Sequence, residues 1–149
     1  GFYLLILALM FKIAIISVGV LPRGPFSDIG ADFATRLKKF AELEFKSVKT
    51  DDRLSDAIPT DSFLIVLEAT GKQFTSEAFA AKLQTLVDDG RRLTIVLGGP
   101  HGVPAELKAR ANLLLSLSPM TTTHDLAHLF FLEQLYRAFT ITKGMTYHY

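Results

Sequence analysis

Hydrophobic residues occur with two different spacings along this chain, and one spacing predicts strands whereas the other predicts helices. Short apolar runs bounded by turn residues are typical of buried strands, and an alternating run is typical of a half-buried strand. These runs cover residues 11–19, 43–49, 63–69, 93–97 and 112–118. Residue 50 begins a polar stretch with a proline, which predicts a loop with at most a short helical turn.

Between the strands, apolar residues recur every three or four positions, which predicts amphipathic helices. The predicted helices cover residues 29–40 and 76–90, a segment that begins at 104, and residues 124–139. Residues that are common at helix ends flank these segments. Thr75 or Ser76 and Thr122 or Thr123 are predicted N-caps, Gly90 is a predicted C-cap, and Pro104 is predicted at a first helical position.

The order of these elements predicts an α/β fold, with a mostly parallel sheet and helices on both of its faces. The chain has 149 residues, which suits one domain with its own core. We assign residues 10–149 to that domain. Residues 1–9 are apolar and run into the first strand, and we interpret them as an extension or a remnant that precedes the domain. A membrane-tethered form that uses this segment is the alternative.

The last predicted helix is apolar on nearly every side, with the sequence HDLAHLFFLEQLYRAF. A helix that is apolar all round must be buried all round. In so small a domain one face can pack on the sheet, and the other needs a second chain. The pattern therefore predicts a homodimer through this helix.

The composition excludes some kinds of chemistry. The chain contains no cysteine, so disulfides, thiolate metal sites and a cysteine nucleophile are excluded, and a reducing cytoplasmic location fits. His124 and His128 have a spacing that can bind a metal, but no third ligand accompanies them, so we predict no metal site and interpret them as capping or interface residues. The formal net charge of +1 means that any contact with RNA depends on a local patch or a shared partner.

Three of the predicted strands end in loops of small residues, EATGK, GGPHG and SLSPMTTTH. Ligands of open α/β sheets bind where the strands end, so the three loops predict a pocket lined by backbone. The glycines match neither a dinucleotide-binding nor a P-loop pattern. As the alternative, Gly98, Gly99 and Gly102 only shape a tight turn, and the hydroxyl residues only cap the next helix.

Taken together, the segments VLGGPHGVP, LSLSPMTTTH and EQLYRAFTITKGMTYHY resemble the small SPOUT methyltransferases of the RlmH type. The resemblance covers residues 10–149 and is strongest from Phe63 onward. It implies a trefoil knot near the C-terminus, a homodimer, and use of S-adenosylmethionine to methylate N3 of a pseudouridine in large-subunit (23S) ribosomal RNA. The implied cofactor-binding residues are Leu67, Gly98, Gly99, Leu117, Ser118, Pro119, Met120, Thr121 and Thr122.

The resemblance also points to residues near the target base, namely His124, Arg137, Tyr147 and His148. His124 is the candidate base for the N3 proton. Arg137 could stabilise the charge that develops on a carbonyl oxygen. Arg137 also stands four residues after Glu133, in the order that favours an ordinary pair within a helix.

The chain departs from the family pattern at His101, His128 and Tyr149, where the family has an acidic or a more basic residue. The departures leave fewer cations for phosphate contacts. They motivate two alternatives, which are a methyltransferase of the same fold with another RNA target and a dimeric nucleotide- or RNA-binding module without catalysis.

Overall fold

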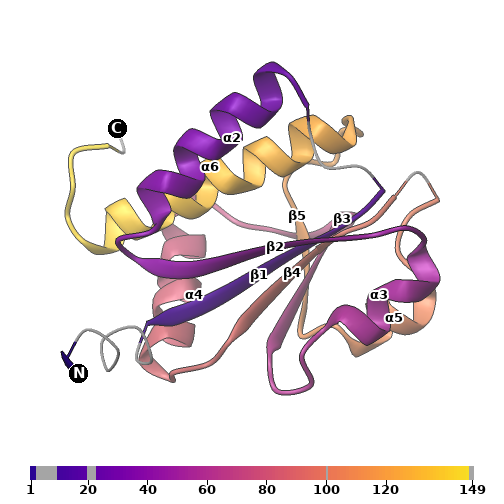
Figure 1. Cartoon of the computed structure of the whole chain (residues 1–149), viewed down its shortest axis with the longest axis horizontal. Helices are drawn as coiled ribbons and strands as arrows, with labels where there is room; N and C mark the ends of the chain where they lie inside the picture. The colour runs from indigo at the N-terminus through magenta and orange to yellow at the C-terminus, as the bar shows by residue number, and fades with distance from the viewer. Residues whose placement is uncertain (3–9, 20–22, 100, 148–149) are drawn as a thin grey trace.

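The computed structural model describes residues 1–2, 10–19, 23–99 and 101–147, and its centre is one parallel sheet (Figure 1). The sheet has five strands in the order β2-β1-β4-β3-β5, and every neighbouring pair is parallel. The strands are β1 (Phe11–Val18), β2 (Ala41–Val48), β3 (Phe63–Gln73), β4 (Leu93–Leu97) and β5 (Leu113–Ser116). The predicted α/β class with a parallel sheet is therefore confirmed.

Helices cover both faces of the sheet, as predicted (Figure 1). The helices are α2 (Pro25–Leu37), α3 (Leu54–Ala57), α4 (Ser76–Asp88), α5 (Ala105–Arg110) and α6 (His124–Thr142), with a 3-10 turn η1 (Asp51–Arg53) before α3. Successive residues of β1 point to opposite faces, so Ile15 packs in the core with α2, α4 and α6, whereas Ile16 packs in the core with α3 and α5.

The ends of the helices follow the capping residues closely. The Thr75 side chain accepts a hydrogen bond from the Ala78 amide at 3.0 Å, and Thr123 accepts one from the Leu126 amide at 3.3 Å. Gly90 follows α4 with a φ of 67°, in the left-handed region that ends many helices. The prediction for Pro104 was wrong by one position, because this residue is the N-cap of α5.

Strand β3 differs most from its prediction, because it continues to Gln73 through a segment expected to be a loop. Its pairing with β5 shifts register between Leu67 and Lys72. At Gly71 a Cβ atom would lie 2.5 Å from the Leu114 carbonyl oxygen, so only glycine allows this approach. A glycine among polar residues is typical of a turn, but here it permits close strand pairing.

Helix α6 lies between α2 and α4 on one face of the sheet. Phe131, Leu132 and Leu135 are almost fully buried, whereas Leu126 is 47% exposed and Phe130 48% exposed. One side of the helix is therefore uncovered in a single chain. No helix in the described part of the chain is long and apolar enough to cross a bilayer, and most of residues 1–9 lies outside that part.

Candidate functional site

A cavity of about 880 Å³ lies where β4 and β5 end and beside the middle of β3, and α2 and α6 close its other side. Most of the residues that the sequence suggested for a cofactor line it, namely Leu67, Gly98, Gly99, Leu117, Ser118, Met120, Thr121 and Thr122. Pro119 is not among the lining residues. The loops that follow β4 and β5 therefore meet at one edge of the sheet, as expected for the carboxyl ends of parallel strands. The first of the three predicted loops, EATGK, is instead part of β3, and it contributes Glu68 and Ala69 to the lining.

The lining of the cavity is mainly apolar, with a few polar groups at defined places. Ile29 and Phe33 of α2, together with Leu126 and Phe130 of α6, supply apolar surface. Among the described lining residues, Glu68 and Glu133 are the charged ones. Apolar walls with a small number of oriented polar groups are typical of small-molecule sites.

The glycines of the second loop are needed for packing within the protein. At Gly98 a Cβ atom would lie 2.7 Å from Val103 Cγ2, and at Gly99 it would lie 3.0 Å from Val18 Cγ1. Gly102 has a φ of 77°, which favours glycine on backbone grounds. The loop folds back on itself through a bridge between Gly99 and Gly102, so the tight-turn interpretation explains these glycines, and the turn also brings bare backbone to the cavity.

A network of polar side chains crosses the cavity wall on α6, with Glu133 at its centre. Glu133 Oε1 accepts hydrogen bonds from Arg137 Nε at 3.1 Å, from Arg137 Nη2 at 2.5 Å and from the Tyr147 hydroxyl at 3.1 Å. Glu133 Oε2 accepts one from Gln134 Nε2 at 2.7 Å, and Gln134 Oε1 accepts one from the Ser76 hydroxyl at 2.9 Å. The predicted pair between Glu133 and Arg137 is confirmed.

This network joins two of the residues predicted to lie near a target base, Arg137 and Tyr147. The Arg137 guanidinium also lies 5.0 Å from the centre of the Tyr147 ring. Burial, followed by the nearby Glu133 carboxylate, raises the pKa of Tyr147, so its hydroxyl stays protonated and donates to Glu133. Of the other two residues in the predicted group of four, His148 lies outside the described residues, and His124 is the first residue of α6.

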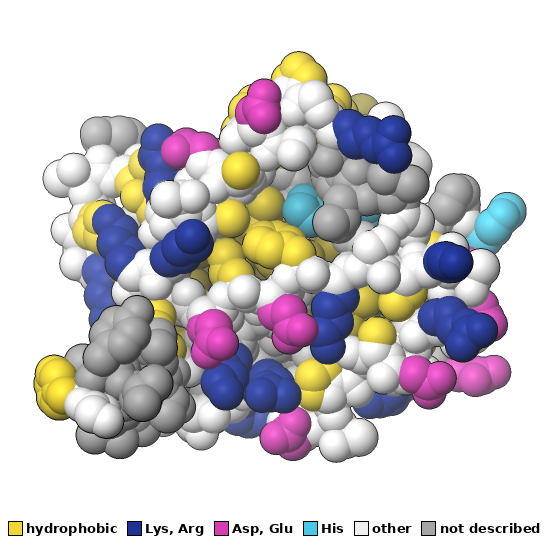
Figure 2. Space-filling model, in the orientation of Figure 1, with side chains coloured by type: hydrophobic (Ala, Val, Ile, Leu, Met, Phe, Trp, Pro, Cys, Tyr) yellow, Lys and Arg dark blue, Asp and Glu magenta, His cyan; other side chains and the backbone are white. Residues whose placement is uncertain are grey.

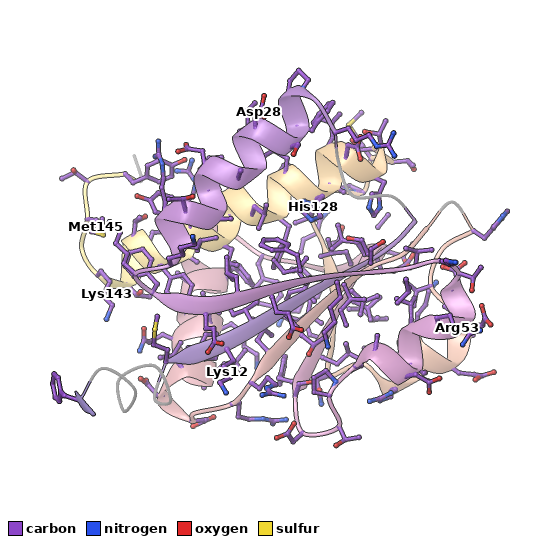
Figure 3. The ribbon with its side chains drawn as sticks, in the orientation of Figure 1. Lys12, Asp28, Arg53, His128, Lys143 and Met145 are labelled. Atoms are coloured by element: carbon purple, nitrogen blue, oxygen red, sulfur yellow. The ribbon has the colours of Figure 1, made fainter. Side chains whose placement is uncertain are left out.

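His124 and His128 lie on a side of α6 that does not line the cavity. Their ring centres are 6.5 Å apart, and His128 lies 6.0 Å from the Phe45 ring of β2. Figure 3 shows His128 projecting from α6 toward the sheet, and in Figure 2 histidine atoms border a hollow with an apolar floor between α2 and β2. The Nε2 atoms of both rings are buried and accept or donate no hydrogen bond within the described structure.

The surroundings of His128 favour a neutral ring. Burial lowers the pKa of His128, the neighbouring His124 lowers it further, and Asp125 acts in the opposite direction. No group of three or more potential metal ligands occurs among the described residues.

We expect the free energy of unfolding to decrease as the pH falls below about 6.5, because His128 takes up its proton more readily in the unfolded chain. Urea unfolding at pH 7.5 and 5.5 measures this decrease. His128→Leu should lose less stability between the two values than the wild type does. As the control, His101→Gln changes an exposed histidine and should keep the wild-type dependence. Equal pH dependence in wild type and His128→Leu would contradict the expectation.

Several cavity residues were missed by the sequence analysis. Glu68 ends the apolar part of β3, and a carboxylate at the end of a buried strand was the available signal. Gln134 was missed because only the packing of α4 against α6 brings it beside Ser76, which was predicted only as a possible cap and does not line the cavity. Ile29 and Phe33 were recognised as the apolar side of a helix, but nothing in the pattern indicates that they face a cavity.

Comparison with known proteins identifies the family to which this chain is similar. Residues 11–148 match the family described as "Predicted SPOUT methyltransferase". A protein of Syntrophotalea carbinolica named ribosomal RNA large subunit methyltransferase H is 39% identical over 92% of this chain and 98% of its own length. Proteins of the same name from Laribacter hongkongensis and Streptococcus mutans are 36% and 35% identical, again over 92% of this chain and nearly all of their own length.

Two solved structures share the fold at low sequence identity. A probable methylase family protein of Haemophilus influenzae aligns with a TM-score of 0.58 at 14% identity, over 89% of this chain and 66% of its own. A probable methyltransferase of Bordetella pertussis aligns with a TM-score of 0.55 at 16% identity, over 88% of this chain and 95% of its own. At such identities the likeness concerns the architecture alone.

Proposed function

Because the chain belongs to the SPOUT methyltransferase family, we propose that it is a methyltransferase of large-subunit ribosomal RNA that uses S-adenosylmethionine. The single observation that carries this proposal is the cavity at the carboxyl ends of β4 and β5 and beside the middle of β3, whose lining includes almost all the residues expected for the donor. The proposed target atom is N3 of a pseudouridine, and the proposed location is the cytoplasm, where ribosomes are found.

The cavity suits a nucleoside joined to an amino acid. Its volume of about 880 Å³ is within the range of small-molecule sites, and its apolar walls can cover an adenine ring. The loop from Leu117 to Thr122 presents backbone groups beside hydroxyls, and the Ser118 hydroxyl accepts a hydrogen bond from the Met120 amide at 3.0 Å, which shapes the turn. The bound donor supplies an electrophilic methyl group on a sulfonium, so the protein needs no acid for its departure.

The acceptor requires removal of the N3 proton and alignment with the methyl group. Glu133 holds the Arg137 guanidinium in a fixed fork, which suits it to stabilise charge on a carbonyl oxygen of the base. The Tyr147 hydroxyl donates to the same Glu133 carboxylate, so we place Tyr147 beside the target base as well. His148 is the next residue in the chain and belongs to the same proposed group.

His124 keeps its proposed role as the base, although its ring lies apart from the cavity lining in the single chain. We expect His124→Gln to lower kcat by about a hundredfold, because general base catalysis contributes on this scale. Donor affinity should stay near the wild-type value, since His124 does not line the cavity. Turnover that equals the wild type would contradict the role.

A second copy of the chain is the proposed cover for the uncovered side of α6. Leu126, Phe130 and Met120, which are 47%, 48% and 79% exposed, lie at the mouth of the cavity, where an apolar partner surface would bury them. The knotted C-terminal topology of the family belongs to the same proposal. Light scattering of the purified protein tests the dimer, and a monomer at micromolar concentration would contradict it.

The function itself is tested with purified protein, methyl-labelled donor and ribosomes or free large-subunit RNA. The proposal predicts that the label enters the large-subunit RNA. Mass mapping of the RNA should then place the label at a pseudouridine. Label at another nucleotide would favour a methyltransferase of the same fold with a different target. Donor binding without any transfer would favour a binding module, and absence of donor binding would contradict the proposal as a whole.

A further inference from the structure

The charges at the cavity are arranged in layers, with carboxylates facing the interior and cations behind them. Glu68, near the end of the apolar part of β3, forms an ion pair with Lys108 of α5, in which Nζ lies 2.9 Å from Oε2. Glu68 lines the cavity and Lys108 does not. On the opposite wall Glu133 pairs with Arg137, which likewise does not line the cavity.

The two carboxylates differ in how many of their acceptor positions are already used. A carboxylate offers about four lone-pair sites. Glu133 receives four hydrogen bonds, three on Oε1 from Arg137 and Tyr147 and one on Oε2 from Gln134. Glu68 receives one from the Thr70 hydroxyl on Oε1 at 3.2 Å, one from Lys108 on Oε2 and a contribution from the Thr70 backbone amide, fewer than Glu133 receives, which leaves capacity for a ligand.

Glu68 is also kept ionised in a place where its charge is poorly screened. The hydrogen bond from Lys108 is the main cause that lowers the pKa of Glu68, and burial opposes it. The Glu68 side chain is 20% exposed, so part of its field acts through protein rather than water. Among the described residues that line the cavity on the side of the sheet, it is the only charged group.

We propose that Glu68 makes the cavity prefer the positively charged methyl donor over its uncharged demethylated product, and that Lys108 sets the strength of this preference. The inference rests on the proposed function. The donor carries one more positive charge than the product, because its sulfur is a sulfonium. In the transfer the methyl–sulfur bond breaks, its electron pair stays on sulfur, and the acceptor nitrogen gives up its proton to the proposed base, His124, as it gains the methyl group. The product therefore loses its attraction to Glu68, which favours its release.

Isothermal titration of the protein with S-adenosylmethionine and, separately, with S-adenosylhomocysteine measures the ratio of the two affinities. Glu68→Gln removes the negative charge and leaves Lys108 behind it, so the preference for the donor should fall by about fivefold. Lys108→Met leaves Glu68 uncompensated, so the preference should rise by about twofold to threefold. The matched control is Glu106→Gln, which removes an exposed carboxylate from the same helix as Lys108 and should leave the ratio unchanged.

Thermal unfolding without ligand establishes that each variant is folded, and if Glu68→Gln fails to fold, Lys108→Met still tests the opposite shift. Opposite shifts in the two variants support the inference. An unchanged ratio, or shifts in the same direction, overturns it while the proposed function stands. A wild-type protein that binds neither nucleoside overturns the proposed function, and the inference with it.

Discussion

Replacing Gly71 by alanine is expected to lower the free energy of unfolding by about 3 kcal/mol, the upper part of the range for a forced overlap in a packed site. The added Cβ would lie 2.5 Å from the Leu114 oxygen, 2.7 Å from the Leu114 carbonyl carbon and 3.0 Å from the Glu68 oxygen. All three atoms belong to the backbone, so no side-chain rotation relieves the overlap. The second half of β3 must then separate from β5.

The same substitution should weaken donor binding, because the register shift beside Gly71 positions both Glu68 and the start of the loop at Leu117. Urea unfolding and titration with S-adenosylmethionine measure the two effects. Gly30→Ala is the matched control, since its Cβ would meet only Leu132 Cδ1 at an ordinary 3.6 Å and alanine favours a helix. This control should be as stable as the wild type or slightly more so. Equal stability of Gly71→Ala and wild type would show that β3 and β5 do not pair as described.

Replacing Glu133 by glutamine is expected to reduce kcat by about a hundredfold, the scale for losing one oriented electrostatic partner of a transition state. The glutamine oxygen is uncharged, so the hydrogen bonds that Oε1 accepts from both Arg137 nitrogens and from Tyr147 lose their charge assistance, and an amide nitrogen replaces the oxygen that accepts from Gln134. Arg137 then samples several orientations rather than one. Donor affinity should change much less, because apolar surface and backbone make up most of the cavity lining.

Single-turnover assays with ribosomes, combined with titration of the donor, separate the effect on the chemical step from the effect on binding. As the control, Glu44→Gln removes an exposed carboxylate that lies 3.8 Å from Lys46 on β2, away from the cavity lining. Its kcat should match the wild type. If Glu133→Gln keeps full turnover, Arg137 does not act through the position that Glu133 gives it.

Sequence patterns were most successful where one physical effect dominates. The buried strands of a parallel sheet are short apolar runs, so β1 and β4 were predicted within a residue or two of their ends. The hydroxyl of Thr75 could be read as a cap because capping involves only neighbours in the chain. The same local chemistry identified the intrahelical pair between Glu133 and Arg137.

Patterns were less successful where distant segments meet. Gly71 resembles a turn residue, and only the approach of β5 explains why β3 continues through it. Gly98 and Gly99 suggested room for a ligand, but the side chains of Val103 and Val18 are what a Cβ atom would meet. His124 lies at the start of α6, as predicted. Which side of that helix faces the cavity depends on how α6 packs against α2 and α4, so the sequence could not show that His124 does not line the cavity.

By itself the sequence determined the α/β class, the starts of α4 and α6, and the two loops that follow β4 and β5 at the carboxyl edge of the sheet. These features depend on periodicity, capping and strand direction, which act between residues close in the chain. Only the tertiary structure decided that Glu68 faces the cavity with Lys108 behind it, and that Glu133 binds Arg137 and Tyr147 together. The partners in these charge layers come from different elements, so their distances, and with them the electrostatics of the site, exist only after the sheet and helices have packed.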